Sequence, residues 1–309
     1  MILCAGESLV DVVPQADGSR LALPGGAVFN TALGLGRLGA DVAYLWPLST
    51  DDHGRRLRAL LDGAGVDTGP CPATDLPTAS AEVTLSDGNA TYVFHLVGTT
   101  ATALTPQPLP AAARALFIGG ISLAIEPAAT AIETLATDAA RAGLTVMIDP
   151  NLRPGLIDDP EALRARLDRL LAVAAIVKLS SDDLDWLSPG MRPEAAARAL
   201  ADRTGALVLH TQGGDGAALL RAGAAPLYEP ALPVEVVDTI GAGDSFNAGV
   251  LAALQAAGAL DDPAHAAPET LARAVRHGIK VAAATVGRQG ADPPWARDLP
   301  AEAGPPAAG

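Results

Sequence analysis

The sequence predicts an α/β fold, namely a three-layer α/β/α sandwich with a mostly parallel central sheet and a small β lid. Short apolar runs alternate with longer helical patterns almost from end to end of the chain. Within the short runs the apolar residues are continuous rather than alternating with polar ones, which is typical of parallel strands covered by helices on both faces. Two polar or turn-rich stretches interrupt this order and account for the lid.

The strands and helices follow one another in regular order. We expect strands at residues 2–3 continuing into 9–10, 42–48, 115–119, 145–149, 175–178 and 206–211. We expect helices at residues 27–38, 52–61, 127–142, 160–171, 193–203, 242–256 and 269–285. Several of these helices begin with proline or an acidic residue, and three are followed by glycine (Gly39, Gly143 and Gly205), as helix termini often are.

The two interruptions lie at about 12–23 and 80–97. The first is polar and rich in turn-forming residues. The second is typical of a β-hairpin, with the runs AEVTL and ATYVFHL joined at Asp87-Gly88. Together they form either a small lid beside the main sheet or ordinary surface hairpins. We expect residues 1–309 to form a single domain with a flexible tail at 299–309.

Composition excludes several classes of protein. The chain has 309 residues, 49% of them apolar, and a net charge of −14 from 35 acidic and 21 basic residues. It can therefore bury a sizeable core, but it lacks the basic surface that nucleic acids or anionic membranes attract. Two cysteines, Cys4 and Cys71, cannot form a disulfide framework or a four-ligand zinc site. With no signal-peptide pattern and no bilayer-spanning run, we expect a cytoplasmic protein.

One motif suggests a dinucleotide site but lacks the required context. Gly34, Gly36 and Gly39 fit the spacing GxGxxG. That fingerprint must follow a strand and open a helix, whereas here the glycines lie in the second half of a helical run that precedes a strand. We therefore interpret Gly34 and Gly36 as close-packing positions and Gly39 as a helix terminus.

The segment 237–247, VDTIGAGDSFN, carries the strongest functional signal. A strand-like run, VEVVD, leads into Gly241-Ala242-Gly243 and then into an apolar helix. A helix start offers unpaired N–H groups and the positive end of a dipole, which suits a phosphate. Asp244 in the first turn is either an acid that complements the dipole or a general base for a hydroxyl nucleophile.

This segment resembles the C-terminal signature of the ribokinase-like, or PfkB, carbohydrate kinases, usually written DTxGAGD. The N-terminal signature has its counterpart in PGGAVFNTA at 24–32, RLG at 37–39 and LSTDDHG at 48–54. The resemblance extends from Gly6 to about Pro293 and implies a ribokinase-like kinase domain with a β lid.

The resemblance also implies roles for individual residues. Asp244 matches the catalytic base, and Gly241, Ala242 and Gly243 match the anion hole that stabilises the transferring phosphoryl group. The positions that match sugar-binding residues are Asp11, Gly25, Gly26 and Asn30. The positions that match the nucleotide loop, in HTQGGDGA, are Thr211, Gly213 and Gly216, although this loop taken alone predicts a hairpin turn.

Within the family, the segments GISLAIEP at 120–127 and DPNLR at 149–153 resemble fructokinases. Arg153 follows a strand at its carboxyl end and is a candidate substrate ligand; the alternative is a surface arginine paired with Asp158 or Asp159. Phe94 is a candidate apolar lid contact or an ordinary core residue.

The chain departs from the family pattern at two places, in the lid and in the NxxE motif, and matches it at a third, the monovalent-cation position. Phe94-His95-Leu96 stands where fructokinases often have FYR, so a lid arginine is missing. The NxxE motif appears as Ser180 to Asp183, which implies ATP contact at Ser180 and an indirect Mg²⁺ role for Asp183. On local pattern a helix N-cap is the stronger interpretation. Asp238 and the loop 287–290 match a monovalent-cation position.

We therefore expect an ATP-dependent sugar kinase of the fructokinase type that uses Mg²⁺, with K⁺ as a candidate activator. Alternatives are a 2-keto-3-deoxygluconate kinase, another PfkB sugar or nucleoside kinase, and a non-catalytic sugar-binding protein on a kinase fold. The expected partners are a small sugar and ATP, without nucleic acid or membrane, and a second copy of the chain paired through the lid.

Overall fold

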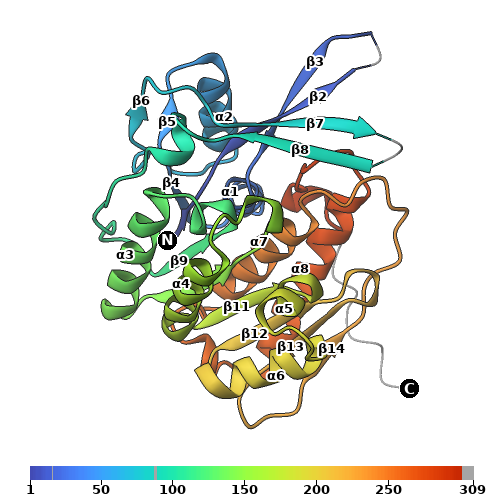
Figure 1. Cartoon of the computed structure of the whole chain (residues 1–309). Helices are drawn as coiled ribbons and strands as arrows, with labels where there is room; N and C mark the ends of the chain where they lie inside the picture. Colours follow the sequence, from blue (N-terminus) through green and yellow to red (C-terminus); the bar gives the residue numbers. More distant parts are fainter. Residues whose placement is uncertain (16, 87–88, 301–309) are drawn as a thin grey trace.

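The computed structural model describes all residues except 16, 87–88 and 301–309 (Figure 1). Its main sheet has the strand order β14-β13-β12-β11-β10-β9-β1-β4. The strands of this sheet are β1 (Ile2–Ala5), β4 (Val42–Leu45), β9 (Ala115–Gly119), β10 (Thr145–Asp149), β11 (Ile176–Ser180), β12 (Leu207–Thr211), β13 (Ala217–Leu220) and β14 (Leu227–Glu229). Neighbours from β4 to β12 run parallel, and β13 and β14 are antiparallel. The mostly parallel sheet is as predicted.

Helices cover both faces of this sheet. They are α1 (Ala27–Arg37), α2 (Asp52–Gly63), α3 (Ala128–Arg141), α4 (Pro160–Val173), α5 (Ser181–Leu187), α6 (Pro193–Thr204), α7 (Ala242–Ala256) and α8 (Pro268–Val286). Short 3₁₀ turns are η1 (Thr100–Thr102), η2 (Gly120–Leu123), η3 (Pro154–Leu156), η4 (Gly213–Asp215), η5 (Pro263–His265) and η6 (Ala296–Asp298). Helix α7 contacts both α1 and α8, while α3 contacts α4 and α5 contacts α6 (Figure 1). None of the described helices is long and apolar enough to cross a membrane.

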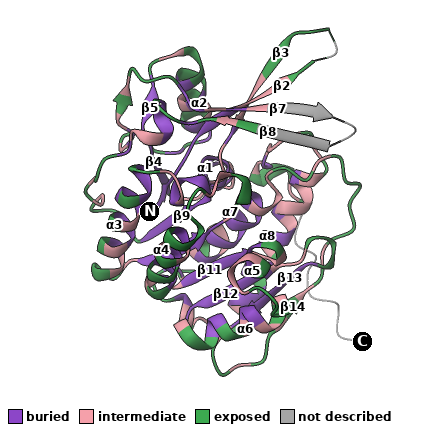
Figure 2. Ribbon diagram, viewed as in Figure 1, coloured by how far each residue is buried: buried purple, intermediate pink, exposed green. Residues whose placement is uncertain are grey.

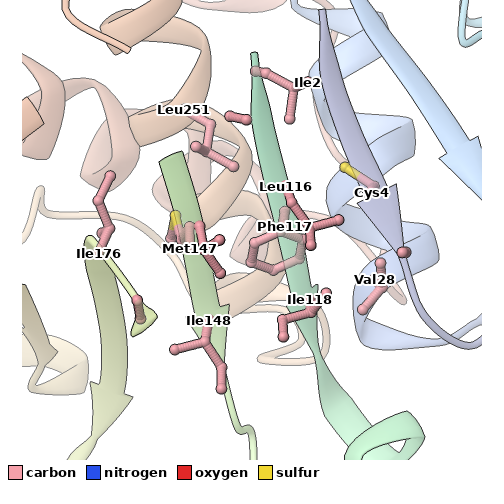
Figure 3. Packing of buried hydrophobic residues seen from close by; sticks show 14 of the residues in the cluster. Ile2, Cys4, Val28, Leu116, Phe117, Ile118, Met147, Ile148, Ile176 and Leu251 are labelled. Atoms are coloured by element: carbon pink, nitrogen blue, oxygen red, sulfur yellow. The ribbon is translucent and has the colours of Figure 1, made fainter. Parts of the chain in front are cut away.

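The core lies between the sheet and its helices. Every residue of β1, β4, β9 and β10 is buried, which explains why these strands are continuous in apolar residues (Figure 2). Figure 3 shows Cys4, Phe117, Met147 and Leu251 among the packed side chains. Both cysteines are free and buried.

A second sheet, here called the lid sheet, projects from the main body (Figure 1). Its strands, in the order β3-β2-β7-β8, are β2 (Leu9–Pro14), β3 (Arg20–Gly25), β7 (Ser80–Ser86) and β8 (Asn89–His95). A two-stranded sheet of β5 (Leu48–Ser49) and β6 (Ala73–Thr74) lies beside it. The predicted turn at Asp87-Gly88 and most of the predicted tail, 299–309, lie outside the described residues.

Three strand predictions were wrong in detail. Residues 9–10 do not continue the first strand, because β1 ends at Ala5 and the chain then turns into the lid sheet, which begins at Leu9 rather than near 12. The single strand expected at 42–48 is divided between two sheets. The run VEVVD forms no strand, because no described strand lies beside it. Its Val237 N–H instead donates a hydrogen bond to the carbonyl of Val286 at the end of α8.

The glycines of the rejected dinucleotide motif serve packing. A β-carbon at Gly34 would lie 2.9 Å from that of Ala248 on α7, and one at Gly36 would lie 2.6 Å from the carbonyl oxygen of Ala64. Gly39 follows the end of α1 with φ of 79°. The close-packing and helix-end interpretation is confirmed.

Candidate active site

A large cavity, about 1420 Å³ in volume, lies at the carboxyl ends of the parallel strands, where open α/β sheets bind ligands. Its wall also includes the lid sheet and the start of α7. The predicted site residues in this wall are Asp11, Gly26, Asn30, Phe94, Arg153, Ser180, Thr211, Gly213, Gly216, Asp238, Gly241, Ala242, Gly243 and Asp244. Gly25 and Asp183 lie behind the wall. Positions that are far apart in the sequence thus meet around one space.

The start of α7 has the geometry of an anion site. Gly241 precedes the helix with φ of 77°, a left-handed conformation that favours glycine, and a β-carbon there would lie 2.7 Å from that of Ala291. Gly241, the N-cap residue, has no side chain with which to cap this helix, although the N–H of Ala242 lies 3.3 Å from the Thr239 carbonyl oxygen. The first-turn N–H groups, including that of Gly243, therefore face the cavity with the positive end of the helix dipole.

Asp244 occupies the first turn of α7 and is 6% exposed. The Asn30 amide donates a hydrogen bond to Oδ2 of Asp244 at 2.9 Å, and the Thr31 hydroxyl donates to its backbone carbonyl at 3.3 Å. Burial raises the pKa of Asp244 to about 7, with Asp149 adding to the rise, while the Asn30 hydrogen bond and Lys178 oppose it. A carboxylate with a pKa near 7 is matched to proton abstraction at neutral pH.

Asp11 and Phe94, two of the predicted sugar-binding residues, lie in the cavity wall on strands of the lid sheet. Asp11 lies on β2, and burial raises its pKa to about 6. Gly25 permits this placement, because a β-carbon there would lie 2.6 Å from Oδ2 of Asp11. Phe94 on β8 is half-buried against an apolar cluster that includes Leu9 and Ile121, so it is a packing residue that also lies in the cavity wall.

Arg153 follows β10 and lies in the cavity wall. Its guanidinium donates to the carbonyl and side-chain oxygens of Asn151 and to the carbonyl of Leu152. These contacts, rather than ion pairs with the acidic residues at 158 and 159, orient the arginine. Asn151 has φ of 43°, so the backbone is held in an unusual conformation beside the cavity.

The loop predicted to hold the nucleotide joins β12 to β13. These strands pair antiparallel, so the hairpin-turn interpretation and the cavity position both hold. Thr211 ends β12, and its hydroxyl lies 3.4 Å from the carbonyl oxygen of Leu179. A β-carbon at Gly216 would lie 2.2 Å from the carbonyl oxygen of Glu229 on β14, so glycine is required there by packing alone.

Ser180 and Asp183 form a capping box at the start of α5, as the local pattern predicts. Oδ2 of Asp183 accepts hydrogen bonds from the backbone N–H and hydroxyl of Ser180, and Oδ1 accepts one from the N–H of Leu152. Asp183 thereby links the segment after β10 to the start of α5. Ser180 itself lies in the cavity wall.

Asp238 joins the two loops beside the start of α7. Its Oδ1 accepts a hydrogen bond from the N–H of Ile240 at 3.0 Å, and Oδ2 accepts one from the N–H of Gly290 at 2.9 Å. The carboxylate therefore lies next to loop 287–290, as the resemblance implies.

Sequence reasoning missed a buried polar cluster under the start of α7. The Lys178 ammonium lies 3.0 Å from Oδ2 of Asp149, which also accepts a hydrogen bond from the Asn247 amide at 2.7 Å. Burial lowers the pKa of Lys178, but the neighbouring carboxylates, Asp149 first, raise it overall, so the amine is charged. Asp149 and Asn247 lie within the segments DPNLR and VDTIGAGDSFN, but the sequence assigned them no role, and no local motif marks Lys178.

Glu7 is a second buried group without a sequence-based prediction. Its carboxylate accepts hydrogen bonds from the N–H of Ala27 and the N–H of Ser122, both at 3.1 Å. Burial raises the pKa of Glu7 to about 7, although these hydrogen bonds oppose the rise. Glu7 thus ties the end of β1 to the start of α1.

Comparison with known proteins agrees with this geometry. The model of the pfkB family of carbohydrate kinases matches residues 1–297. The fructokinase of Rhizobium leguminosarum bv. trifolii is 39% identical over 262 residues, covering 82% of this chain and 80% of the relative. A crystal structure of the fructokinase of Xylella fastidiosa with bound ATP superposes with a TM-score of 0.85 at 31% identity, covering 94% of this chain and 93% of the other.

A third similar protein binds a different substrate. The aminoimidazole riboside kinase of Salmonella enterica, solved with aminoimidazole riboside and an ATP analogue, has a TM-score of 0.80 and 30% identity, covering 94% of each chain. The whole-chain family match and the fructokinase relative show that this chain belongs to the pfkB family of carbohydrate kinases.

Proposed function

We propose that this protein is an ATP-dependent fructokinase that phosphorylates a primary hydroxyl of D-fructose. The observation that carries the proposal is the position of Asp244: a buried carboxylate with a pKa near 7, at an uncapped helix start, in a cavity that also contains Asp11 and the Thr211 loop. A base, an anion site and two ligand-binding regions in one space are what phosphoryl transfer to a hydroxyl requires.

The proposed reaction needs little covalent work from the protein. The bond from the γ-phosphorus to the β–γ bridging oxygen breaks, and a bond from that phosphorus to the sugar oxygen forms. The hydroxyl proton passes to Asp244, and ADP leaves with the electron pair of the broken bond. The N–H groups of residues 241–243 stabilise the charge on the transferring group, while Asp11, Gly26 and Asn30 hold the sugar. Gly25 leaves room for the Asp11 carboxylate.

Mg²⁺ is proposed to arrive with the nucleotide. Among the described residues, no group of three or more His, Cys, Asp or Glu side chains could hold a metal. Mg²⁺ characteristically keeps several waters and binds through phosphates and one or two carboxylates. Asp149 fits a water-mediated role, because its buried Oδ1 has no hydrogen-bond partner within the described part of the chain. Asp183 is near enough to raise the pKa of Asp149. Mg²⁺ neutralises phosphate charge when bound.

A monovalent cation, K⁺, is proposed at Asp238 and loop 287–290. The support is the hydrogen bond from the Gly290 N–H to Asp238, which holds a carboxylate beside loop 287–290 in the same cavity wall as residues 241–243. Use of ATP also supports a cytoplasmic location.

Fructose is favoured over the alternatives by the fructokinase relatives and by the lid sequence. A keto-acid substrate would gain from Arg153, but the described end of β8 offers His95 and Leu96 where an arginine would meet a carboxylate. Aminoimidazole riboside is the second candidate, because a kinase for it is 30% identical over 94% of this chain.

We also propose that two copies of the chain pair through the lid sheet. Val12, Glu82 and Val93 are register partners across three strands, on the face opposite Asp11 and Phe94. Val93 is 53% exposed on an edge strand, and an exposed valine on an unpaired edge is suited to contact with a second copy.

The test is ADP release with MgATP and K⁺ across fructose, 2-keto-3-deoxygluconate, ribose, tagatose, glucose, adenosine and aminoimidazole riboside. We expect a specificity constant for fructose at least about tenfold above the others. If another sugar or nucleoside is preferred, the proposed kinase activity stands and the proposal that fructose is the substrate is overturned. If no compound reacts, sugar binding by calorimetry distinguishes the non-catalytic alternative from an untested substrate.

The role of Asp244 has a direct test. Asp244→Asn keeps the shape of the side chain and removes the base, so kcat should fall about 10²- to 10⁴-fold while the sugar still binds. Kinetics and calorimetry on the same folded sample measure both. Turnover close to that of the wild type would remove Asp244 as the base.

A further inference from the structure

Lys178 is an unusual residue in this chain. It is one of only two lysines in 309 residues, the other being Lys280. Its side chain is 5% exposed, yet it belongs to the wall of the cavity. A β-carbon at Gly243 would lie 3.1 Å from Nζ of Lys178. The ammonium therefore lies against the first turn of α7, within the proposed anion site.

The surroundings of Lys178 favour a ligand-binding role over a purely structural one. A buried ion pair costs desolvation energy, and apolar residues of similar volume often replace one without loss of stability. Here the ammonium has three N–H donors, of which the ion pair with Asp149 takes one. Asp149 is fixed in turn by the Asn247 amide from α7. The arrangement holds a cation in place while leaving donors for another acceptor.

The charge of the cavity points to the identity of that acceptor. The described wall carries several carboxylates, including Glu7, Asp11 and Asp244, but its cations are Arg153 and Lys178. Arg153 is exposed and bonded to its own loop, whereas Lys178 is buried and adjoins the helix start. A phosphate at the start of α7 would meet Lys178 before any other cation of the wall.

We propose that Lys178 is a catalytic residue that donates a hydrogen bond to the transferring γ-phosphoryl group, and that Asp149 and Asn247 position it. This inference rests on the proposed kinase function. As the bond to the bridging oxygen breaks and the bond to the sugar oxygen forms, the ammonium stabilises charge on the non-bridging oxygens and stays protonated. The proton from the sugar goes to Asp244 and not to the lysine.

The first test is steady-state kinetics of Lys178→Met, with Lys280→Met as the matched control. Lys280 lies on α8 outside the cavity wall. Loss of one preorganised donor costs about 10²- to 10³-fold in kcat, so we expect that loss at 178 with KM for the sugar changed less than about threefold. Lys280→Met should retain turnover within about twofold of the wild type. A Lys178→Met enzyme with kcat within about threefold of wild type would overturn the proposal.

The second test measures contact with the γ-phosphate without turnover. In the Asp244→Asn background, calorimetry compares MgATP with MgADP for lysine and methionine at 178. We expect MgATP affinity to fall at least about tenfold and MgADP affinity to change less than about threefold, because ADP lacks the group that the lysine contacts. Equal losses for both nucleotides, or none, would overturn the assignment. This comparison remains decisive even if no sugar is phosphorylated.

The double variant Lys178→Met/Asp149→Asn distinguishes a folding defect from loss of contact with the γ-phosphate. Removing both charges avoids an unpaired buried carboxylate, so the double variant should melt closer to the wild type than Lys178→Met does. The nucleotide comparison is repeated in this background with Asp149→Asn alone as reference. Loss of MgATP affinity relative to that reference supports the contact, and equal affinity overturns it.

Discussion

At the scale of single residues, the hydrogen bond from Asn30 to Asp244 joins substrate recognition to base strength. The Asn30 amide binds Oδ2 of Asp244 at 2.9 Å and so favours the ionised carboxylate. Oδ1 of Asn30 is buried without a partner among the described residues, which leaves it for a sugar hydroxyl. One side chain can therefore hold the substrate while it sets the pKa of the base.

Asn30→Ala should raise the pKa of Asp244 above its value of about 7. Hydrogen bonds to charged groups contribute about 1.5–3 kcal/mol, so we expect the acid limb of the kcat/KM profile to move up by about one to two pH units. The measurement is kcat/KM for fructose from pH 5.5 to 9. A lower plateau with the same apparent pKa would mean that Asn30 binds sugar without tuning the base.

At the scale of elements, α8 packs closely against α7, the helix that carries the proposed base Asp244. A β-carbon at Gly278 on α8 would lie 2.8 Å from Val250 and 2.9 Å from Phe246, both on α7. Phe246 and Ile279 from these helices also lie in the cavity wall. The two helices thus approach closely only because glycine stands at their crossing.

Gly278→Ala should therefore destabilise the protein by about 1–3 kcal/mol, because overpacking shifts well-packed neighbours. Gly63→Ala is the matched control, since nothing lies within 4 Å of a β-carbon there at the end of α2. Urea unfolding measures both free energies. Equal stability of the two variants would show that the helices can separate without cost.

The elements also show what local sequence can and cannot specify. Proline and glycine marked several helix ends correctly, as at Pro160 at the start of α4 and Gly205 after α6, because these signals act within a few residues. The run at 234–238 has strand-forming valines but no partner strand, so its propensity was overridden. Lys178 was missed because its role depends on β10, β11 and α7 meeting, which no local pattern encodes.

At the scale of the whole molecule, the active-site cavity contains three carboxyl groups whose pKa values are raised by burial. Burial raises the pKa of Glu7 to about 7, that of Asp11 to about 6 and that of Asp244 to about 7. Each group holds its proton more tightly in the folded chain than in the unfolded one. Each therefore favours folding at low pH and loses that contribution as pH rises through the interval from about 4 to its folded pKa.

The conditions for stability and for catalysis should consequently differ. Asp244 must be ionised to act as a base, so activity should increase as pH rises through about 7, where its contribution to stability has been lost. Ionising Asp244 costs the wild type stability as pH rises, whereas the asparagine of Asp244→Asn cannot ionise. The unfolding free energy of the variant minus that of the wild type should therefore be larger at pH 8 than at pH 5. Because the wild type pays part of this cost already at pH 5, only the interval from pH 5 to about 7 contributes, and we expect the advantage to grow by about 3 kcal/mol. Urea unfolding of both proteins at the two pH values measures the difference directly, and other titrating groups cancel because they are common to both.

An advantage that is the same at pH 5 and pH 8 would mean that Asp244 is already ionised in the folded protein at pH 5. That result would remove the basis for an activity rise near pH 7.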